Sequence, residues 1–150
     1  MQLSVVTAGL FAVINSVCAA PTLNTGKDEV SAMADVPPWT VQDFQRTCNK
    51  KDTSCTITFH IDTKLEPRTP CMYSITGAPA SRAPANSITC GPYTISSGWS
   101  GQFGEESGFT TWSIVDWNKR LIIWPAYADR ELVNGQTVTP DKSYAPQTLP

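Results

Sequence analysis

The residues that could support catalysis are acidic side chains near aromatic rings, the composition of a sugar-cleaving site. Glycoside hydrolysis uses two carboxyl groups that flank the bond to be broken. Glu105 and Glu106 follow Trp99 and Phe103 within a few positions. Adjacent glutamates on an extended chain point to opposite faces, so this pair alone does not make such a site. A carbohydrate-active enzyme is therefore an alternative interpretation, with four candidate acids: Glu105, Glu106, Asp116 and Asp129.

Histidine-dependent catalysis would have to use His60, because the sequence contains one histidine. His60 lies in residues 56–63, where Ile57, Phe59 and Ile61 alternate with polar residues. This alternation is typical of a half-buried strand and places His60 on the polar, exposed face. The sequence also lacks the Gly-x-Ser-x-Gly motif of a nucleophile elbow. We therefore predict no catalytic residue, no metal site and no cofactor, and expect a protein that is not an enzyme.

The segment 98–108 combines four of the nine glycines with large aromatic residues. Glycine permits sharp bends and close backbone approach, so the segment can bend while it presents Trp99 and Phe103. One interpretation is a binding loop that offers these two rings and the polar Gln102. The other is a bulged strand whose rings fill the core, and the large area that tryptophan buries favours it. Both interpretations stay open at this stage.

Trp117 is a further candidate binding residue because it lies in the polar turn 116–120, where burial is hard to arrange. Beside Lys119 and Arg120, its ring is either a contact for a partner or packed flat over the domain's own surface. The candidate binding residues are therefore Trp99, Gln102, Phe103 and Trp117.

The chain contains five cysteines, and Cys18 falls within a segment that we expect to be removed. The remaining four predict two disulfides, for which three connectivities exist. We favour local pairing, because each pair flanks a turn-rich segment. The bridge between Cys71 and Cys90 would then contribute about 3 kcal/mol by loop entropy. A zinc site is disfavoured because no Cys-x-x-Cys spacing occurs and a secreted protein favours bridges. The favoured pairs are Cys48–Cys55 and Cys71–Cys90.

The order of segments predicts one secreted domain. Residues 1–20 have an apolar stretch and small residues before Pro21, as in a secretory signal peptide, and the stretch is too short for a membrane span. Residues 21–38 form a polar leader, 39–140 the domain, and 141–150 a polar tail that we expect to fray. The net charge of −2 argues against a nucleic-acid partner.

Hydrophobic residues in the domain repeat with a period of two, which indicates strands. Seven or eight short strands separated by turn signals predict an all-β fold, a small antiparallel β-barrel or sandwich with two disulfides and a filled interior. We expect a bulge at residues 43–44 and a bulge or edge position at 91–92, within a strand over 88–95. Asn134-Gly135 predicts a hairpin turn.

Four stretches of the sequence resemble a family of small fungal secreted proteins, the hypersensitive-response-inducing elicitors. They are Trp-Thr-Val-Gln-Asp-Phe at 39–44, the alternating strand to Thr63, SSGWSGQFG with GFTT over 96–111, and LIIWPAYADREL at 121–132. The resemblance covers most of the chain after Trp39. The opening pattern is also similar, more distantly, to the secreted β-barrel allergens of moulds, in which a bridge across two strands falls where Cys71 and Cys90 lie.

The resemblance implies a secreted extracellular protein that binds a plant cell-surface or apoplastic component, a protein or a glycan. We expect the protein to be a monomer. It further implies induction of plant defence or cell death without catalysis, and it transfers no active-site residues. Two other interpretations stay open: a secreted carbohydrate-binding or carbohydrate-active protein, and a structural protein of the cell wall.

Overall fold

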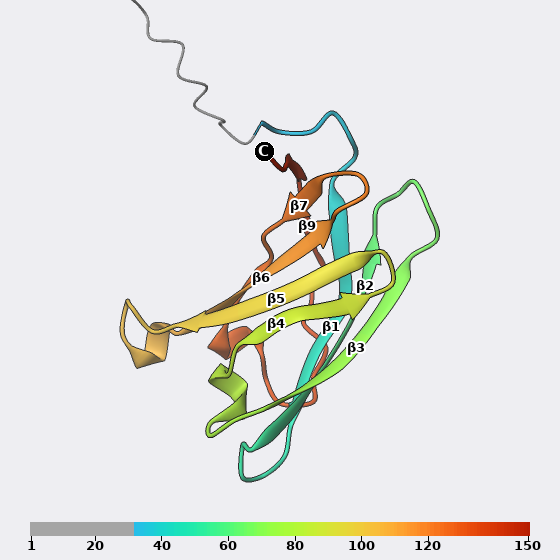
Figure 1. Ribbon diagram of the computed structural model, residues 1–150. Helices are drawn as coiled ribbons and strands as arrows, with labels where there is room; N and C mark the ends of the chain where they lie inside the picture. Colours follow the sequence, from blue (N-terminus) through green and yellow to red (C-terminus); the bar gives the residue numbers. More distant parts are fainter. Residues whose placement is uncertain (1–31) are drawn as a thin grey trace, which may run out of the picture.

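The computed structural model describes residues 32–150, so the expected signal peptide and most of the leader lie outside the described residues. Two antiparallel sheets pack face to face in this part of the chain (Figure 1). The small sheet has the order β3 (Thr69–Thr76), β2 (Ser54–Asp62), β1 (Trp39–Cys48) and β9 (Lys142–Tyr144). The large sheet has the order β10 (Gln147–Thr148), β7 (Leu121–Ile123), β6 (Phe109–Asp116), β5 (Tyr93–Ser100) and β4 (Ala85–Cys90), and β8 (Ala126–Ala128) also pairs with β6. The all-β prediction is confirmed, and the architecture is a sandwich.

Side-chain alternation in β2 is the one that the sequence predicted. In β2, Ile57, Phe59 and Ile61 are buried while His60 points to the outer side of the small sheet. The expected bulge in β1 is present, because the register against β2 shifts between Gln42 and Gln45. Asp43 within this bulge has a positive φ of 53°, a conformation that aspartate tolerates better than most residues. The bulge therefore turns Asp43 toward the side of the sheet that carries His60.

Aromatic rings from both sheets fill the space between them. Phe44 stacks on Phe59 and on Tyr127, with ring centroids 5.5 and 4.3 Å apart. Trp112 meets Phe44 edge to face, and its Nε1 donates a hydrogen bond of 2.8 Å to the Tyr73 hydroxyl. Large aromatic side chains thus occupy the centre of the sandwich, and the expectation of a filled interior is confirmed.

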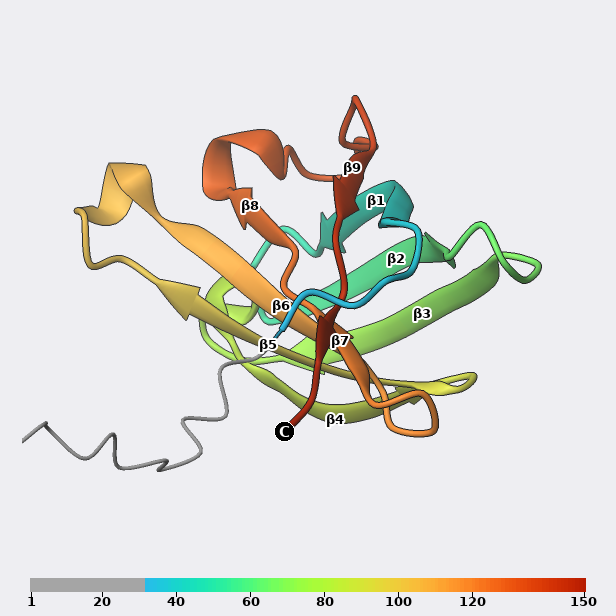
Figure 2. The same ribbon diagram turned by 90° about the horizontal axis from the view of Figure 1, so that it is seen from above.

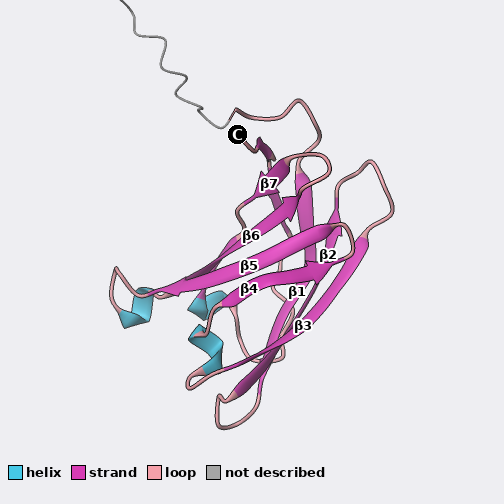
Figure 3. Cartoon of the chain, viewed as in Figure 1, coloured by secondary structure: helices cyan, strands magenta, loops and turns pink. Residues whose placement is uncertain are grey.

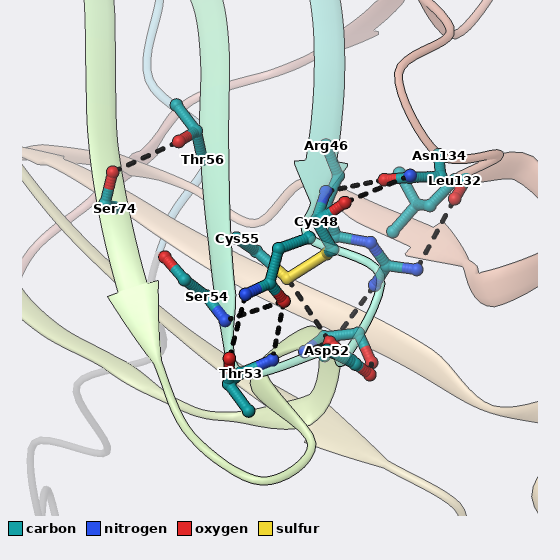
Figure 4. Close-up of a disulfide and its surroundings, with 12 residues drawn as sticks. Arg46, Cys48, Asp52, Thr53, Ser54, Cys55, Thr56, Ser74, Leu132 and Asn134 are labelled. Atoms are coloured by element: carbon teal, nitrogen blue, oxygen red, sulfur yellow. Dashed lines mark hydrogen bonds between the residues drawn. A yellow bond between two sulfur atoms is a disulfide. The ribbon is translucent and has the colours of Figure 1, made fainter.

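Both disulfides have the predicted pairing. Cys48 and Cys55 are opposite residues at the closed end of the β1–β2 hairpin (Figure 4). The amide of Asn134 brackets this end, accepting from the backbone nitrogen of Cys48 and donating to its carbonyl oxygen. Cys71 of β3 and Cys90 of β4 link the small sheet to the large one. The four sulfur atoms are bonded in pairs, so they are not free to act as zinc ligands.

Three expectations about local structure were wrong. Gly91 and Pro92 form the turn between two paired strands, β4 and β5, and are not a bulge within one strand. The turn at Gly135 exists, but its flanks pair with β1, since Gly135 and Val138 donate backbone hydrogen bonds to Arg46 and Phe44. The tail after residue 140 does not fray: β9 extends the small sheet and β10 extends the large one.

Three short 3₁₀ turns gather at one end of the sandwich, as Figure 3 shows. They are η1 (Ala80–Arg82), η2 (Glu105–Ser107) and η3 (Asp129–Glu131). η2 lies in the connection between β5 and β6, and this connection projects beyond the rest of the described chain (Figures 1 and 2). Within residues 32–150, no helix is long and apolar enough to cross a membrane.

Candidate binding surface

Trp99 serves as an anchor for its own loop. It pairs with Thr110, whose side chain is buried on the inner side of β6, so Trp99 also points to the inner side. Its Nε1 donates a hydrogen bond of 2.8 Å to Oδ2 of Asp129 in η3. The guanidinium carbon of Arg82, in η1, lies 4.3 Å from the centre of the indole ring. These contacts hold β5 against η1 and η3, so the ring is engaged within the molecule.

The glycines of the loop are explained by the position of this ring. A Cβ atom on Gly108 would lie 2.6 Å from Oδ2 of Asp129 and 2.9 Å from the indole of Trp99. A Cβ atom on Gly101 would overlap the same indole. The two glycines therefore provide the space into which Trp99 folds, a packing role that the spacing alone did not reveal.

Phe103 and Gln102 remain exposed at the projecting end of the β5–β6 connection. The Phe103 side chain is 72% exposed, and its ring stacks on Phe109 with centroids 6.2 Å apart. Phe109 alternates with the buried Thr110, so it lies on the outer side of the large sheet. The stacking therefore places Phe103 at one end of that outer side.

Trp117 lies at the opposite end of the same side. It follows β6, is 60% exposed, and donates from Nε1 to Oγ1 of Thr94 at 3.1 Å. Thr94 alternates with the buried Tyr93 and Ile95, which places its hydroxyl and the indole of Trp117 on the outer side of the sheet. The turn that contains Trp117 is fixed by Asp116, which is 2% exposed and accepts hydrogen bonds from the backbone nitrogens of Asn118 and Lys119.

Trp124 lies between these two ends and was not among the residues singled out from the sequence. The pairs Ile114–Ile123 and Thr111–Ala126 share one register, which puts Trp124 opposite Ser113. The ring is 52% exposed, whereas the next residue, Pro125, is fully buried. Alternation counted back from the buried Tyr127 would have placed Trp124 outside, but the preceding apolar run hid the pattern.

These residues define a surface that we call the outer face. It consists of the outward side chains of four neighbouring strands, with Trp117 and Phe103 at its ends. Its outward residues are Thr94, Ser96, Gly98 and Ser100 of β5, Phe109, Thr111, Ser113 and Val115 of β6, Ile122 of β7, Trp124, and Ala126 and Ala128 of β8. None of these twelve residues carries a charge. A shallow hollow of about 280 Å³ beside Trp124 is lined by Ser96, Ser97, Gly98, Thr111, Ser113 and Trp124.

None of the candidate acids lines the hollow beside Trp124. Glu105 and Glu106 are exposed in η2, and Glu105 forms an ion pair of 3.3 Å with Arg82. Asp129 accepts the hydrogen bond from Trp99 and lies 3.7 Å from Arg46. Asp116 is buried at the other end of β6, where it pairs with Tyr93 across the sheet. The buried Asp116 thus holds a turn in place, and the partly buried Asp129 holds the ring of Trp99.

A second hollow, of about 660 Å³, lies on the outer side of the small sheet. His60 lines it and is half-buried, with Nδ1 3.3 Å from Oδ2 of Asp43. Arg68 lies 3.5 Å from the same carboxylate oxygen, and Met72 in the wall is 77% exposed. The expected strand histidine is therefore on the polar face as predicted, but the bulge at Asp43 gives it an acidic neighbour.

Two comparisons with known proteins show what the chain is similar to. Residues 40–149 match the family model described as effector TSP1. A protein of Hypocrea virens with the name effector TSP1 is 49% identical over 144 residues, which cover 95% of this chain and 95% of that protein. Residues 40–149 include both disulfides and the outer face.

Proposed function

Because the chain belongs to the effector TSP1 family of fungal effectors, we propose that it is secreted and acts on a plant by binding a component of the cell surface or apoplast. In this proposal the fungal protein, once bound to its plant partner, induces plant defence or cell death. It acts as a monomer and performs no catalysis. The sequence of residues 1–20, which is typical of a secretory signal, and the two disulfides support secretion.

The observation that carries the binding proposal is the exposure of aromatic rings on the outer face. Trp117 and Trp124 are 60% and 52% exposed, and Phe103 is 72% exposed. Large aromatic side chains provide much of the energy in protein recognition, because they bury a wide area with few rotatable bonds. Rings that remain in contact with water on a rigid sheet are therefore suited to meet a partner.

A non-catalytic mode is supported by the contacts of the candidate acids. Asp129 accepts a hydrogen bond from Trp99, and Asp116 holds the turn that contains Trp117. Glu105 pairs with Arg82 on the surface, so its carboxylate has a cationic partner within the protein. These contacts give three of the candidate acids a partner within the protein, whereas the two acids of a glycoside hydrolase flank a bound substrate.

Infiltration of leaves with the folded protein tests this proposal. We expect an oxidative burst or ion leakage that depends on dose, and we expect the double variant Glu105→Gln/Glu106→Gln to be as active as the unchanged protein. Reduced and alkylated protein serves as the matched control, because it has the same sequence but lacks the two disulfides that stabilise the fold. A folded sample that elicits no response in several host species would overturn the proposal, and loss of the response in the glutamine variant would overturn its non-catalytic part.

A further inference from the structure

Each sheet of the sandwich ends in strands that pair with one neighbouring strand only, and β3 is the longest of them among residues 32–150. It pairs with β2 and with no other described strand. β9 and β10 have only 3 and 2 residues, and β4 is interrupted by a register shift where Ser87 has a positive φ of 52°. Charges, prolines and bulges normally keep an edge from pairing with another chain. In β3 the register is unbroken, no residue is charged, and Pro70 near its start is the one such feature.

The hydrogen bonds at the end of the β1–β2 hairpin show which backbone groups of β3 point outward. The backbone nitrogen and oxygen of Cys48 bond to the side chain of Asn134, so they point away from β2 (Figure 4). In an antiparallel pair of this kind the opposite residue, Cys55, also directs its backbone groups away, toward β3. It therefore bonds to Ile75, and every second residue of β3 bonds to β2 in the same way. After the Cys71–Cys90 bridge, the residues whose N–H and C=O groups point to the open side are Met72, Ser74 and Thr76.

The Cys71–Cys90 bridge limits this open edge at one end. The Cα atoms of the two cysteines are 5.6 Å apart, so β4 lies close to β3 there. A Cβ atom on Gly91 would lie 3.0 Å from the side chain of Thr69, which shows the same crowding. Beyond the bridge the alternate residues of β3 are exposed as far as Thr76. An added strand would therefore pair with the second half of β3 and not with its start.

The core side of the same edge leaves apolar surface incompletely covered. Ile75 of β3 and Ile88 of β4 are only partly buried where they pack against the hydrophobic core. Their neighbours on the core side, Tyr73 and Cys90, are buried. An apolar side chain on the core side of an added strand would become a cross-strand neighbour of Ile75 and cover it.

We propose that the open edge of β3 takes up an extended segment of a partner protein as an added strand. The inference goes beyond the proposed function, because this edge belongs to the small sheet and not to the outer face. The occupant is a polypeptide because the edge offers N–H and C=O groups that repeat every two residues, a distance of about 6–7 Å. An extended polypeptide carries the complementary groups at the same repeat. Where the segment faces Ile75, its residue is apolar.

A second copy of this chain is the competing occupant of the edge. In each copy β4 lies beside β3 on its open side, held there by the Cys71–Cys90 bridge. Pairing the β3 edges of two copies would therefore bring two β4 strands into the space around the new ladder. A single extended segment has no flanking strand of this kind, so the crowding favours the segment over a second folded copy.

Backbone hydrogen exchange, measured by NMR on the full disulfide-bonded protein, tests the inference. The probe is a peptide in which threonine and valine alternate, with a lysine at each end for solubility. In the free protein we expect fast exchange at Ser74 and Thr76, and slow exchange at Tyr73 and Ile75, whose N–H groups point to β2. The probe should slow exchange at Ser74 and Thr76 by at least about tenfold. A probe of the same sequence with methylated backbone nitrogens should not bind, because it has the side chains without the N–H donors.

Two variants at one position separate the backbone from the side chain. Ser74→Pro removes an N–H group that β2 does not use, so it should preserve the fold, as Pro70 does in the same strand. We expect it to weaken probe binding by at least about tenfold. Ser74→Ala keeps both backbone groups, as alanine does at any position of this edge, and should bind the probe like the unchanged protein.

Four results would each overturn the inference. They are no protection by the probe, equal protection by the methylated probe, slow exchange at Ser74 in the free protein, and a dimer that protects Ser74 in place of the probe. The methylated probe keeps the test decisive even where Ser74→Pro fails to fold. Because the assay uses no leaf tissue, loss of probe binding with an intact leaf response would overturn this inference alone. Probe binding without a leaf response would overturn the proposed function alone.

Discussion

Phe103 stacks on Phe109 with ring centroids 6.2 Å apart, and this contact folds the tip of the β5–β6 connection onto the outer side of the large sheet. Trp117 reaches the same side from the other end of β6 through its hydrogen bond to Thr94. Phe103 and Trp117, which are 14 positions apart in the sequence, therefore mark the two ends of one surface. Trp124, from the link between β7 and β8, lies between them.

The packing of Trp99 on its glycines predicts a selective loss of stability. Gly108→Ala would place a methyl group against Asp129 and the indole, so we expect the free energy of unfolding to fall by about 1–3 kcal/mol, as for other overpacked sites. Gly98→Ala is the matched control, because its added Cβ meets nothing within 4 Å. Urea unfolding followed by circular dichroism measures both variants. Equal stability of the two would contradict the assigned role of Trp99.

The two disulfides are expected to contribute unequally. Cys71 and Cys90 are 19 residues apart and link the two sheets, whereas Cys48 and Cys55 are 7 apart and close one hairpin. Loop entropy gives about 3.3 kcal/mol for the longer loop and about 2.5 kcal/mol for the shorter one. Paired Cys→Ala variants, compared by thermal unfolding, should therefore place the Cys71/Cys90 variant lower in stability. The reverse order would show that the Cys48–Cys55 bridge contributes more to stability than the entropy of its short loop predicts.

Core tyrosines predict a loss of stability at alkaline pH. Burial raises the pKa of Tyr73 from 10.0 to about 12, and burial together with the charge of Asp116 raises the pKa of Tyr93 to about 12. Folding thus favours the neutral phenols, so their contribution is complete below pH 10 and is lost as the pH rises toward 12. Tyrosinate absorbance of the folded protein should appear at higher pH than that of the protein in urea. Coincident titration curves would contradict the burial of these hydroxyls.

The hydrogen bond between Trp112 and Tyr73 links the two sheets within the core. Tyr73→Phe would leave the Nε1 group of Trp112 without its 2.8 Å partner, at a cost of about 1–3 kcal/mol. Phe59→Leu is a useful comparison, since it reduces the volume of a neighbouring core residue without removing a hydrogen bond. Chemical denaturation of the two variants gives the measurement. A Tyr73→Phe variant as stable as the unchanged protein would show that the Trp112 nitrogen finds another acceptor.

Local sequence patterns predicted the features that depend on neighbouring residues. The alternation around Phe59 identified β2, and the change of parity near Asp43 identified the bulge. The pairing of Cys71 with Cys90 followed from the turn-rich segment between them. These signals are strong because alternation and turn formation depend on residues that are only a few positions apart in the chain.

Long-range pairing set what local patterns could not predict. The tail appeared free because Lys142 and its neighbours are polar, yet β9 pairs with β1 about one hundred residues away. Gly101 and Gly108 looked like hinges of a binding loop, but they make room for Trp99, which is held by Asp129 from η3. Of the candidate binding residues, the structure brings Phe103 and Trp117 to one face, turns Trp99 inward, and adds Trp124.

The response of leaf tissue to graded doses of a surface variant tests the central claim most directly. Trp117→Ala/Trp124→Ala removes both exposed indoles of the outer face while leaving both disulfides and the core in place. We predict that this variant needs at least about tenfold more protein than the unchanged chain to cause the same ion leakage. The matched variant Met72→Ala, on the other sheet, should require an unchanged dose. Identical dose curves for the indole variant and the unchanged protein, with both folded, would contradict the outer face as the surface by which this effector is recognised.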